Sequence, residues 1–210
     1  MISNPSPFSG FATITADLYS FVPPNGPSAH PPSPVLTLRA ACSALPEGGV
    51  GLAFTLEGQL QALRLPACET PQAWPLWQHT CFEAFLSAPD AQSYREYNFS
   101  PAGLWAAMAF RRYREMERKL TSPSPLIERL PSPLVGAGLE NAALHLTARL
   151  PRALLPNSTL LRIGLSAVIE RADGQREYWA LHHPRAERAD FHHPDGWTLR
   201  LNTLIERTQT

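Results

Sequence analysis

Apolar and polar residues alternate along much of the chain, a pattern that predicts short β-strands separated by turns. In segment 49–58, GVGLAFTLEG, four apolar residues from Val50 to Leu56 fall on one face of an extended chain. In segment 160–170, LLRIGLSAVIE, five apolar residues from Leu161 to Ile169 do the same. Further segments with strand character are 35–42, 59–66, 80–86, 94–100, 104–110, 143–151, 176–183 and 197–206.

Two of these predicted strands carry a specific expectation about their faces. Segment 35–42 is expected to place Leu36, Leu38 and Ala40 on its apolar side. In segment 59–66 the apolar side changes from one face to the other partway along, so its strand pattern is weaker.

Segments 80–86 and 94–100 are close enough to pair as a hairpin across the turn APDAQS. Period two places Cys81, Glu83 and Phe85 on one face of the first strand. The same rule places Tyr94, Glu96 and Asn98 together on the second strand. Segment 104–110 follows after SPAG, so three successive strands are expected.

Proline and charge interrupt this pattern at four places. Residues 23–34 and 121–138 are rich in proline and are predicted to be loops. The charged segment 111–120, RRYREMERKL, is expected to form a short helix or to leave the sheet, and one helical turn is expected after Pro151. With no alternation of strands and helices, the fold class is all-β, an antiparallel two-sheet β-sandwich. We expect an N-terminal segment at 1–34 with a Pro-rich loop, then a single ligand-binding sandwich at 35–210.

Composition excludes several function classes. The chain has 210 residues and a formal net charge of zero, so no general attraction to nucleic acid is expected. No stretch approaches the roughly 20 apolar residues that cross a bilayer, and no cationic segment precedes an apolar one near residue 1. We therefore expect a cytoplasmic protein that does not bind membranes. Its three cysteines are odd in number, lack CxxC spacing and are expected to be free thiols: Cys42, Cys68 and Cys81.

Four stretches carry a resemblance to a known group of proteins. They are LWQHTCFEAFL, YREYNFSPAGLWAAMAF, GLSAVIERADGQREYWALHHP and DFHHPDGWTLRL, which lie within residues 76–201, and the resemblance as a whole spans residues 35–201. The chain resembles bacterial DOMON-like domain proteins of uncharacterised function and is remotely similar to family 9 carbohydrate-binding modules. The resemblance implies a two-sheet β-sandwich whose relatives bind sugars or haem. The carbohydrate modules hold sugar between tryptophans, for which the candidates are Trp77, Trp105, Trp179 and Trp197.

We predict a binding site for a small polar ligand, a saccharide or sugar derivative, with no cofactor. A sugar-binding site needs a flat aromatic side chain and a few polar side chains, and residues 76–110 supply both. Met108 and His79 match no axial haem motif. The alternative for the polar residues is a satisfied cluster at the mouth of the sandwich. The predicted ligand-binding residues are Trp77, His79, Glu83, Glu96, Asn98 and Trp105.

Other functions remain open at this stage. Glu83 and Glu96 could act as general acid and base in a hydrolase or lyase of glycans. A module that binds a protein partner is a further alternative. The paired histidines at 182–183 and 192–193 suggest metal, but neighbours on a strand point to opposite faces and Pro follows each pair, which favours a turn. Cys81 with His79 could form a reactive pair, although no orienting third group is evident.

Overall fold

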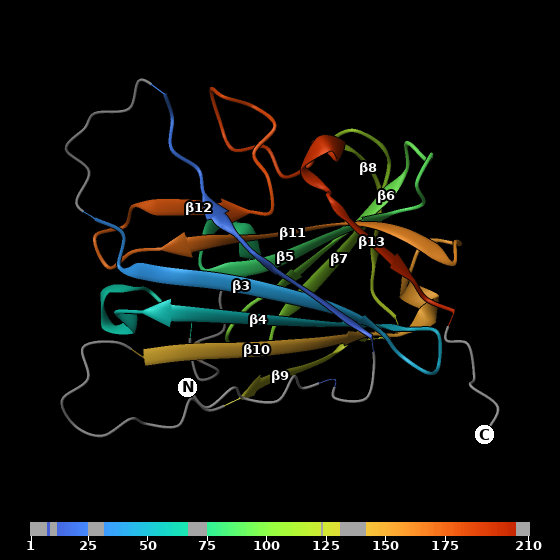
Figure 1. Ribbon diagram of the computed structural model, residues 1–210, viewed down its shortest axis with the longest axis horizontal. Helices are drawn as coiled ribbons and strands as arrows, with labels where there is room; N and C mark the ends of the chain where they lie inside the picture. The colour runs from blue at the N-terminus through green and yellow to red at the C-terminus, as the bar shows by residue number, and fades with distance from the viewer. Residues whose placement is uncertain are drawn as a thin grey trace.

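Two antiparallel β-sheets face each other in the computed structural model, which describes residues 8, 12–24, 32–66, 75–122, 124–130 and 142–204, without the side chains of 128–130 and 142 (Figure 1). The first sheet has five strands in the order β1 (Thr13–Asp17), β3 (Val35–Ala44), β4 (Val50–Gly58), β10 (Ala142–Leu150) and β9 (Leu126–Leu130). The all-β sandwich predicted from the sequence is confirmed.

The second sheet has eight strands. Seven of them follow the order β2 (Tyr19–Ser20), β12 (Arg176–Ala180), β11 (Leu160–Glu170), β5 (Cys81–Ser87), β6 (Tyr94–Phe99), β7 (Trp105–Arg112) and β8 (Glu115–Leu120). The eighth, β13 (Leu199–Asn202), pairs with the first residues of β11. Short 3₁₀ turns are found at Leu60–Ala62, Leu76–Gln78, Arg152–Leu154 and Pro194–Gly196. The turn at Arg152–Leu154 is the helical turn predicted after Pro151.

The main core fills the space between the two sheets. It contains the inward residues that alternation predicted, such as Leu52 and Phe54 of β4, and Ile163 and Leu165 of β11. Phe54 meets Phe82 of the opposite sheet with ring centroids 5.1 Å apart. Every second residue of the central strands therefore lies in one continuous apolar layer.

The hairpin prediction is also confirmed. β5 pairs antiparallel with β6, with Glu83 opposite Asn98 and Phe85 opposite Glu96, and β6 pairs with β7. Tyr97 and Phe99 point into the main core, while Tyr94, Glu96 and Asn98 point to the outer face of the sheet.

Three segments differ from the sequence prediction. Residues 111–120 form neither a helix nor an excursion: β7 runs on to Arg112, turns at Tyr113 and Arg114, and returns as β8. An edge strand can be charged because it needs no second apolar neighbour, and Arg111 and Arg112 both pair with Glu115. Residues 126–130, expected in a loop, form strand β9 at the edge of the other sheet.

The third difference is segment 59–66, which forms a 3₁₀ turn and one isolated bridge between Leu63 and Arg171 instead of a strand. Because the apolar side of this segment changes partway along, neither of its faces could pack on the core over its whole length. A smaller correction affects β3, where an irregularity between Val35 and Thr37 shifts the pairing with β4. Val35 is therefore buried and Leu36 is exposed, the reverse of the expected faces at this end of the strand.

The N-terminal residues take part in both sheets. β1 pairs with β3 over five residues, and β2 pairs with β12 at Trp179 and Ala180. Residues 25–31 of the predicted Pro-rich loop lie outside the described residues, as does Cys68. In the part of the chain that is described, no helix has the length and apolar character needed to cross a bilayer.

One hydrogen bond ties the central sheet to the turn at Arg152–Leu154. The buried Tyr97 hydroxyl donates to the carbonyl of Leu154. We predict that Tyr97→Phe lowers the free energy of unfolding by about 1–2 kcal/mol, because it leaves a buried carbonyl without its donor. Urea denaturation followed by tryptophan fluorescence measures this. Tyr19→Phe is the matched control, since Tyr19 is exposed, and an equal loss there would contradict the prediction.

Candidate functional site

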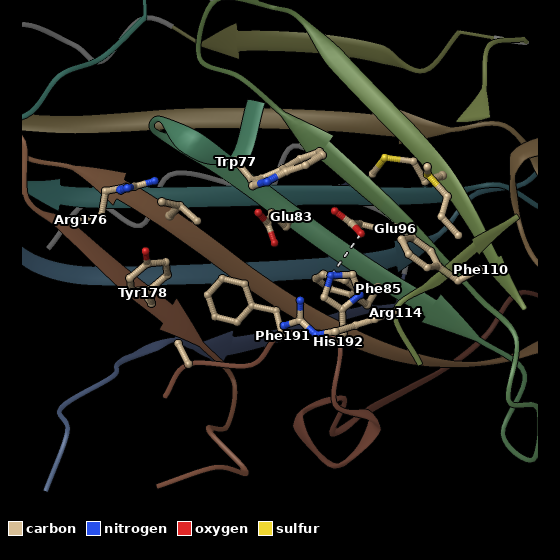
Figure 2. Close-up of a pocket in the computed structure, with 14 residues that line it drawn as sticks. Trp77, Glu83, Phe85, Glu96, Phe110, Arg114, Arg176, Tyr178, Phe191 and His192 are labelled. Atoms are coloured by element: carbon tan, nitrogen blue, oxygen red, sulfur yellow. Dashed lines mark ion pairs between the residues drawn. The ribbon is translucent and has the colours of Figure 1, made fainter. Parts of the chain in front are cut away.

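A cavity of about 420 Å³ lies on the outer face of the eight-stranded sheet, on the side away from the main core (Figure 2). Strands β5, β6, β7, β8, β11 and β12 supply its floor. Residues 189–192, in the segment between β12 and β13, supply one wall. Its aromatic lining consists of Trp77, Phe85, Phe110, Tyr178 and Phe191, and its charged or titratable lining includes Glu83, Glu96, Arg114, Arg176 and His192.

The outer face of this sheet is unusually apolar because a loop covers it. A second buried cluster, separate from the main core, contains Phe85, Tyr94, Met108, Phe110 and Trp197. Four of these residues come from β5, β6 and β7, whereas Trp197 comes from the segment between β12 and β13. We call this segment, residues 181–198, the covering loop. It is shown in orange and red at the top of Figure 1.

Trp197 fixes the covering loop to the sheet. Its indole stacks on Phe85 with centroids 6.0 Å apart, and its Nε1 donates to the carbonyl of Phe191 at 2.8 Å. Gly164 of β11 lies beneath it: a Cβ at this position would be 2.2 Å from Trp197 Cδ1. Arg162 donates to the carbonyls of Pro194 and Trp197. The loop can therefore approach the sheet closely only because residue 164 has no side chain.

Two carboxyl groups from adjacent strands lie on the floor of the cavity. Glu83 and Glu96 keep 3% and 5% of their surface exposed, and Figure 2 shows both directed into the cavity. Glu83 makes one hydrogen bond to a described residue, with Ser166 Oγ at 3.4 Å. Glu96 accepts from Asn98 Nδ2 at 2.8 Å.

Burial governs the protonation of both groups. Desolvation and the neighbouring charge of Glu96 hold the pKa of Glu83 well above its usual range. Desolvation raises the pKa of Glu96 to about 7, against the opposing effects of Asn98 and Arg114. Burial therefore favours the protonated form of both groups, and the charge of Glu96 favours it further at Glu83.

A chain of polar contacts links Glu96 to the covering loop. His192 Nε2 is 3.7 Å from Glu96 Oε2, and His192 Nδ1 is 2.7 Å from the Tyr94 hydroxyl. Burial and Arg114 lower the pKa of His192 to about 4, so the imidazole is neutral at pH 7 and its contact with Glu96 is not a charged pair. The Tyr94 oxygen accepts from the Arg114 backbone N–H at 3.1 Å, which leaves its own proton for Nδ1.

Arg114 and Asp190 form the outer end of this chain. Arg114 Nη2 donates to the fully buried carboxylate of Asp190 at 2.9 Å, and the Tyr113 hydroxyl donates to the same group at 2.6 Å. Burial opposes ionisation of Asp190, but the two donors outweigh it and lower its pKa. The β7–β8 turn is thereby joined to the covering loop.

The structure brings together three of the six residues predicted to bind ligand. Trp77, Glu83 and Glu96 line the cavity, and Asn98 supports Glu96 from below. His79 and Trp105 do not line it. His79 Nδ1 lies 2.8 Å from a carboxylate oxygen of Glu170, and Trp105 packs against the main core on the opposite face of the sheet.

Most of the wall was missed by sequence reasoning. Tyr178 could have been found, because it lies on the outer face of β12 one step from the core residue Trp179. Phe191 and His192 belong to an irregular loop, and no periodicity assigns a loop side chain to a face. Arg114 was missed because its segment was expected to leave the sheet.

The other sequence candidates have structural partners. Among the described residues, no three His, Cys, Asp or Glu side chains converge as a metal site would require. Cys42 and Cys81 are free and buried. Desolvation, and to a smaller extent the negative charge of Glu83, raises the pKa of Cys81 well above its usual value. Cys81 Sγ lies 3.5 Å from Asn98 Oδ1, whereas His79 is bonded elsewhere, so the two do not form a reactive pair. Met108 lies in the apolar cluster that lines the cavity.

Comparison with known proteins supports the fold. No family model and no curated protein matches the chain. A crystal structure from Bacteroides uniformis, described as a "putative carbohydrate-binding protein", superimposes with a TM-score of 0.58 at 16% identity, covering 90% of this chain and 85% of that one. A family 9 carbohydrate-binding module from Caldicellulosiruptor kristjanssonii in complex with cellotriose gives a TM-score of 0.46 at 12% identity, with coverage of 92% and 87%. The first of these likenesses supports the same sandwich architecture.

The raised pKa of Glu96 predicts a pH effect on stability. The folded state holds a proton on Glu96 up to about pH 7, whereas an unfolded chain releases it near pH 4.5, so this contribution to stability is lost as pH rises from about 4.5 to 7. In this range Glu96 should lower the free energy of unfolding by on the order of 1 kcal/mol per pH unit, and we expect Glu96→Gln to remove this decrease. The opposite effect of His192 is present in both proteins and cancels in the difference.

Denaturant unfolding of both proteins at pH 5, 6 and 7 provides the measurement. The stability of Glu96→Gln relative to the unsubstituted chain should increase with pH. A constant or decreasing difference would contradict the assignment of a raised pKa to Glu96.

Proposed function

We propose that the protein binds a small saccharide or sugar derivative in the cavity on the outer face of the eight-stranded sheet, without chemistry of its own. The observation that carries this proposal is the presence of two buried carboxyl groups among aromatic side chains in one cavity. A volume of about 420 Å³ is within the range of roughly 300–1,000 Å³ typical of small-molecule sites.

The lining matches the two kinds of surface that a sugar ring presents. Trp77 and Phe191 offer flat apolar faces to the C–H side of a ring, and Figure 2 shows Trp77 on one side of the carboxyl groups and Phe191 on the other. The carboxyl groups of Glu83 and Glu96 offer acceptors to hydroxyl groups and, in the protonated form that burial favours, donors as well.

The architecture gives independent support. The Bacteroides uniformis protein, which shares this fold over most of both chains, is described as carbohydrate-binding. The DOMON-like resemblance of residues 35–201 implies a ligand-binding sandwich as well. A protein-docking module is less favoured, since it would be expected to present a flat apolar face and this face is hollowed and lined with carboxyl groups.

Two tryptophan variants distinguish binding from folding. We expect Trp77→Ala to weaken sugar binding about tenfold or more, because its indole lines the cavity. Trp105→Ala should instead lower the free energy of unfolding by about 2 kcal/mol, since Trp105 packs on the main core. A thermal-shift screen against mono- and oligosaccharides identifies a ligand, and calorimetry then compares the variants. Unchanged affinity in Trp77→Ala would remove the cavity from the proposal.

A glycan hydrolase or lyase is the second candidate, because Glu83 and Glu96 share one cavity and burial raises the pKa of both, as the general acid of such a pair requires. It predicts release of sugar from a broad panel of nitrophenyl glycosides and oligosaccharides, with at least about 100-fold slower turnover in Glu83→Gln. Sugar binding without release of any product would leave the binding function and exclude this one.

A further inference from the structure

We propose that the ligand carries an ammonium group, as an amino sugar does, and that Glu83 and Glu96 hold this group between them. The inference rests on the proposed sugar-binding function and narrows its ligand class. It starts from an imbalance in the cavity: two carboxyl groups are buried on adjacent strands, and among the described residues no cationic side chain is hydrogen-bonded to either of them.

Glu83 is the more demanding of the two groups. It is almost completely buried, points into the cavity, and has one long hydrogen bond with Ser166 Oγ at 3.4 Å. A buried carboxyl group that lacks strong partners is costly to the fold. A donor that enters the cavity can supply the missing partner, and an ammonium group supplies three donors together with the opposite charge.

The guanidinium groups of the cavity do not fill this place. Arg114 is bonded to the buried carboxylate of Asp190, which neutralises it locally. Arg176 is exposed and is paired with Glu170. On this face of the sheet the pair Val168–Tyr178 lies between Arg176 and Ser166, the residue that contacts Glu83. Figure 2 shows Arg176 beside Tyr178, at the far end of the cavity from Glu96.

Aromatic rings around the carboxyl groups favour a cation as well. Trp77, Phe191 and Tyr178 line the cavity on different sides of Glu83. Ring faces attract cations, and the attraction is stronger where water is excluded. An anionic sugar would instead bring a third negative group toward two buried carboxyl groups.

Binding of an ammonium group should also change the protonation of the site. A nearby positive charge favours ionised carboxylates, so Glu83 and Glu96 should release protons when the cation enters. A neutral sugar gives no such release. The titratable and charged groups that surround the pair are Cys81, Tyr94, Arg114, Arg176, Tyr178, Asp190 and His192.

Calorimetry with matched sugars tests the inference. The probes are D-glucosamine, D-galactosamine and D-mannosamine, each beside its neutral parent hexose and its N-acetyl derivative, in phosphate and in Tris at pH 6.5, where a primary amine of this kind is charged. At least one amino sugar should bind about tenfold or more tightly than both of its neutral counterparts. The difference in heat between the two buffers should show release of up to one proton per amino sugar bound.

Two variants assign the effect to the carboxyl group. Glu83→Gln keeps the size of the side chain and should lose the preference for the amino sugar, with less proton release because only Glu96 remains to ionise. Glu47→Gln makes the same change at an exposed position in the β3–β4 turn and should keep both. Retention of the preference in Glu83→Gln would overturn the inference.

The remaining outcomes separate this inference from the proposed function. Equal affinity for amino and neutral sugars would overturn the ammonium group and leave saccharide binding in place. Spermidine is included as an amine that is not a sugar. If it binds and no sugar does, the ammonium site is retained and saccharide binding is overturned. Absence of binding by every probe would overturn both.

Discussion

The contact between the covering loop and the outer face of the eight-stranded sheet determines most of what is distinctive in this molecule. Trp197 lies against Gly164 and stacks on Phe85, and the loop that carries it excludes water from that face. A sheet face that would otherwise be solvated becomes a second apolar layer with a cavity in it. Without this cover, Glu83 and Glu96 would be ordinary solvated carboxylates with ordinary pKa values.

The stability of the sandwich and the chemistry of the cavity depend on opposite faces of the same strands. Phe82, Ala84 and Leu86 of β5 fill the main core, while Glu83 and Phe85 line the cavity. The rigid inner layer therefore fixes the positions of the outer side chains, which is what a preformed ligand site needs. Exchange of residues on the outer face should then alter binding more than folding.

The polar groups where the covering loop meets the sheet are paired with one another, so that charges there are neutralised. Asp190 neutralises Arg114, and burial together with Arg114 keeps His192 a neutral imidazole beside Glu96, where it is hydrogen-bonded to Tyr94. Each of these groups has a close partner, whereas among the described residues Glu83 has a single hydrogen bond, from Ser166 Oγ at 3.4 Å. This single under-satisfied carboxyl group is why the ligand, and not the protein, is expected to complete the site.

Period-two alternation was enough to predict the all-β class, the three successive strands β5, β6 and β7, and the strand faces that carry Glu83 with Phe85 and Glu96 with Asn98, because side-chain direction in a strand depends only on position along the chain. It failed where a local irregularity or an edge changed the rule, as at Leu36, at segment 59–66 and in β8. Alternation also could not say that Trp105 faces the core while Trp77 faces the cavity, since it shows which residues share a face and not which layer covers that face. Only the tertiary structure decided this, by folding residues 181–198 over the sheet through contacts between residues distant in sequence.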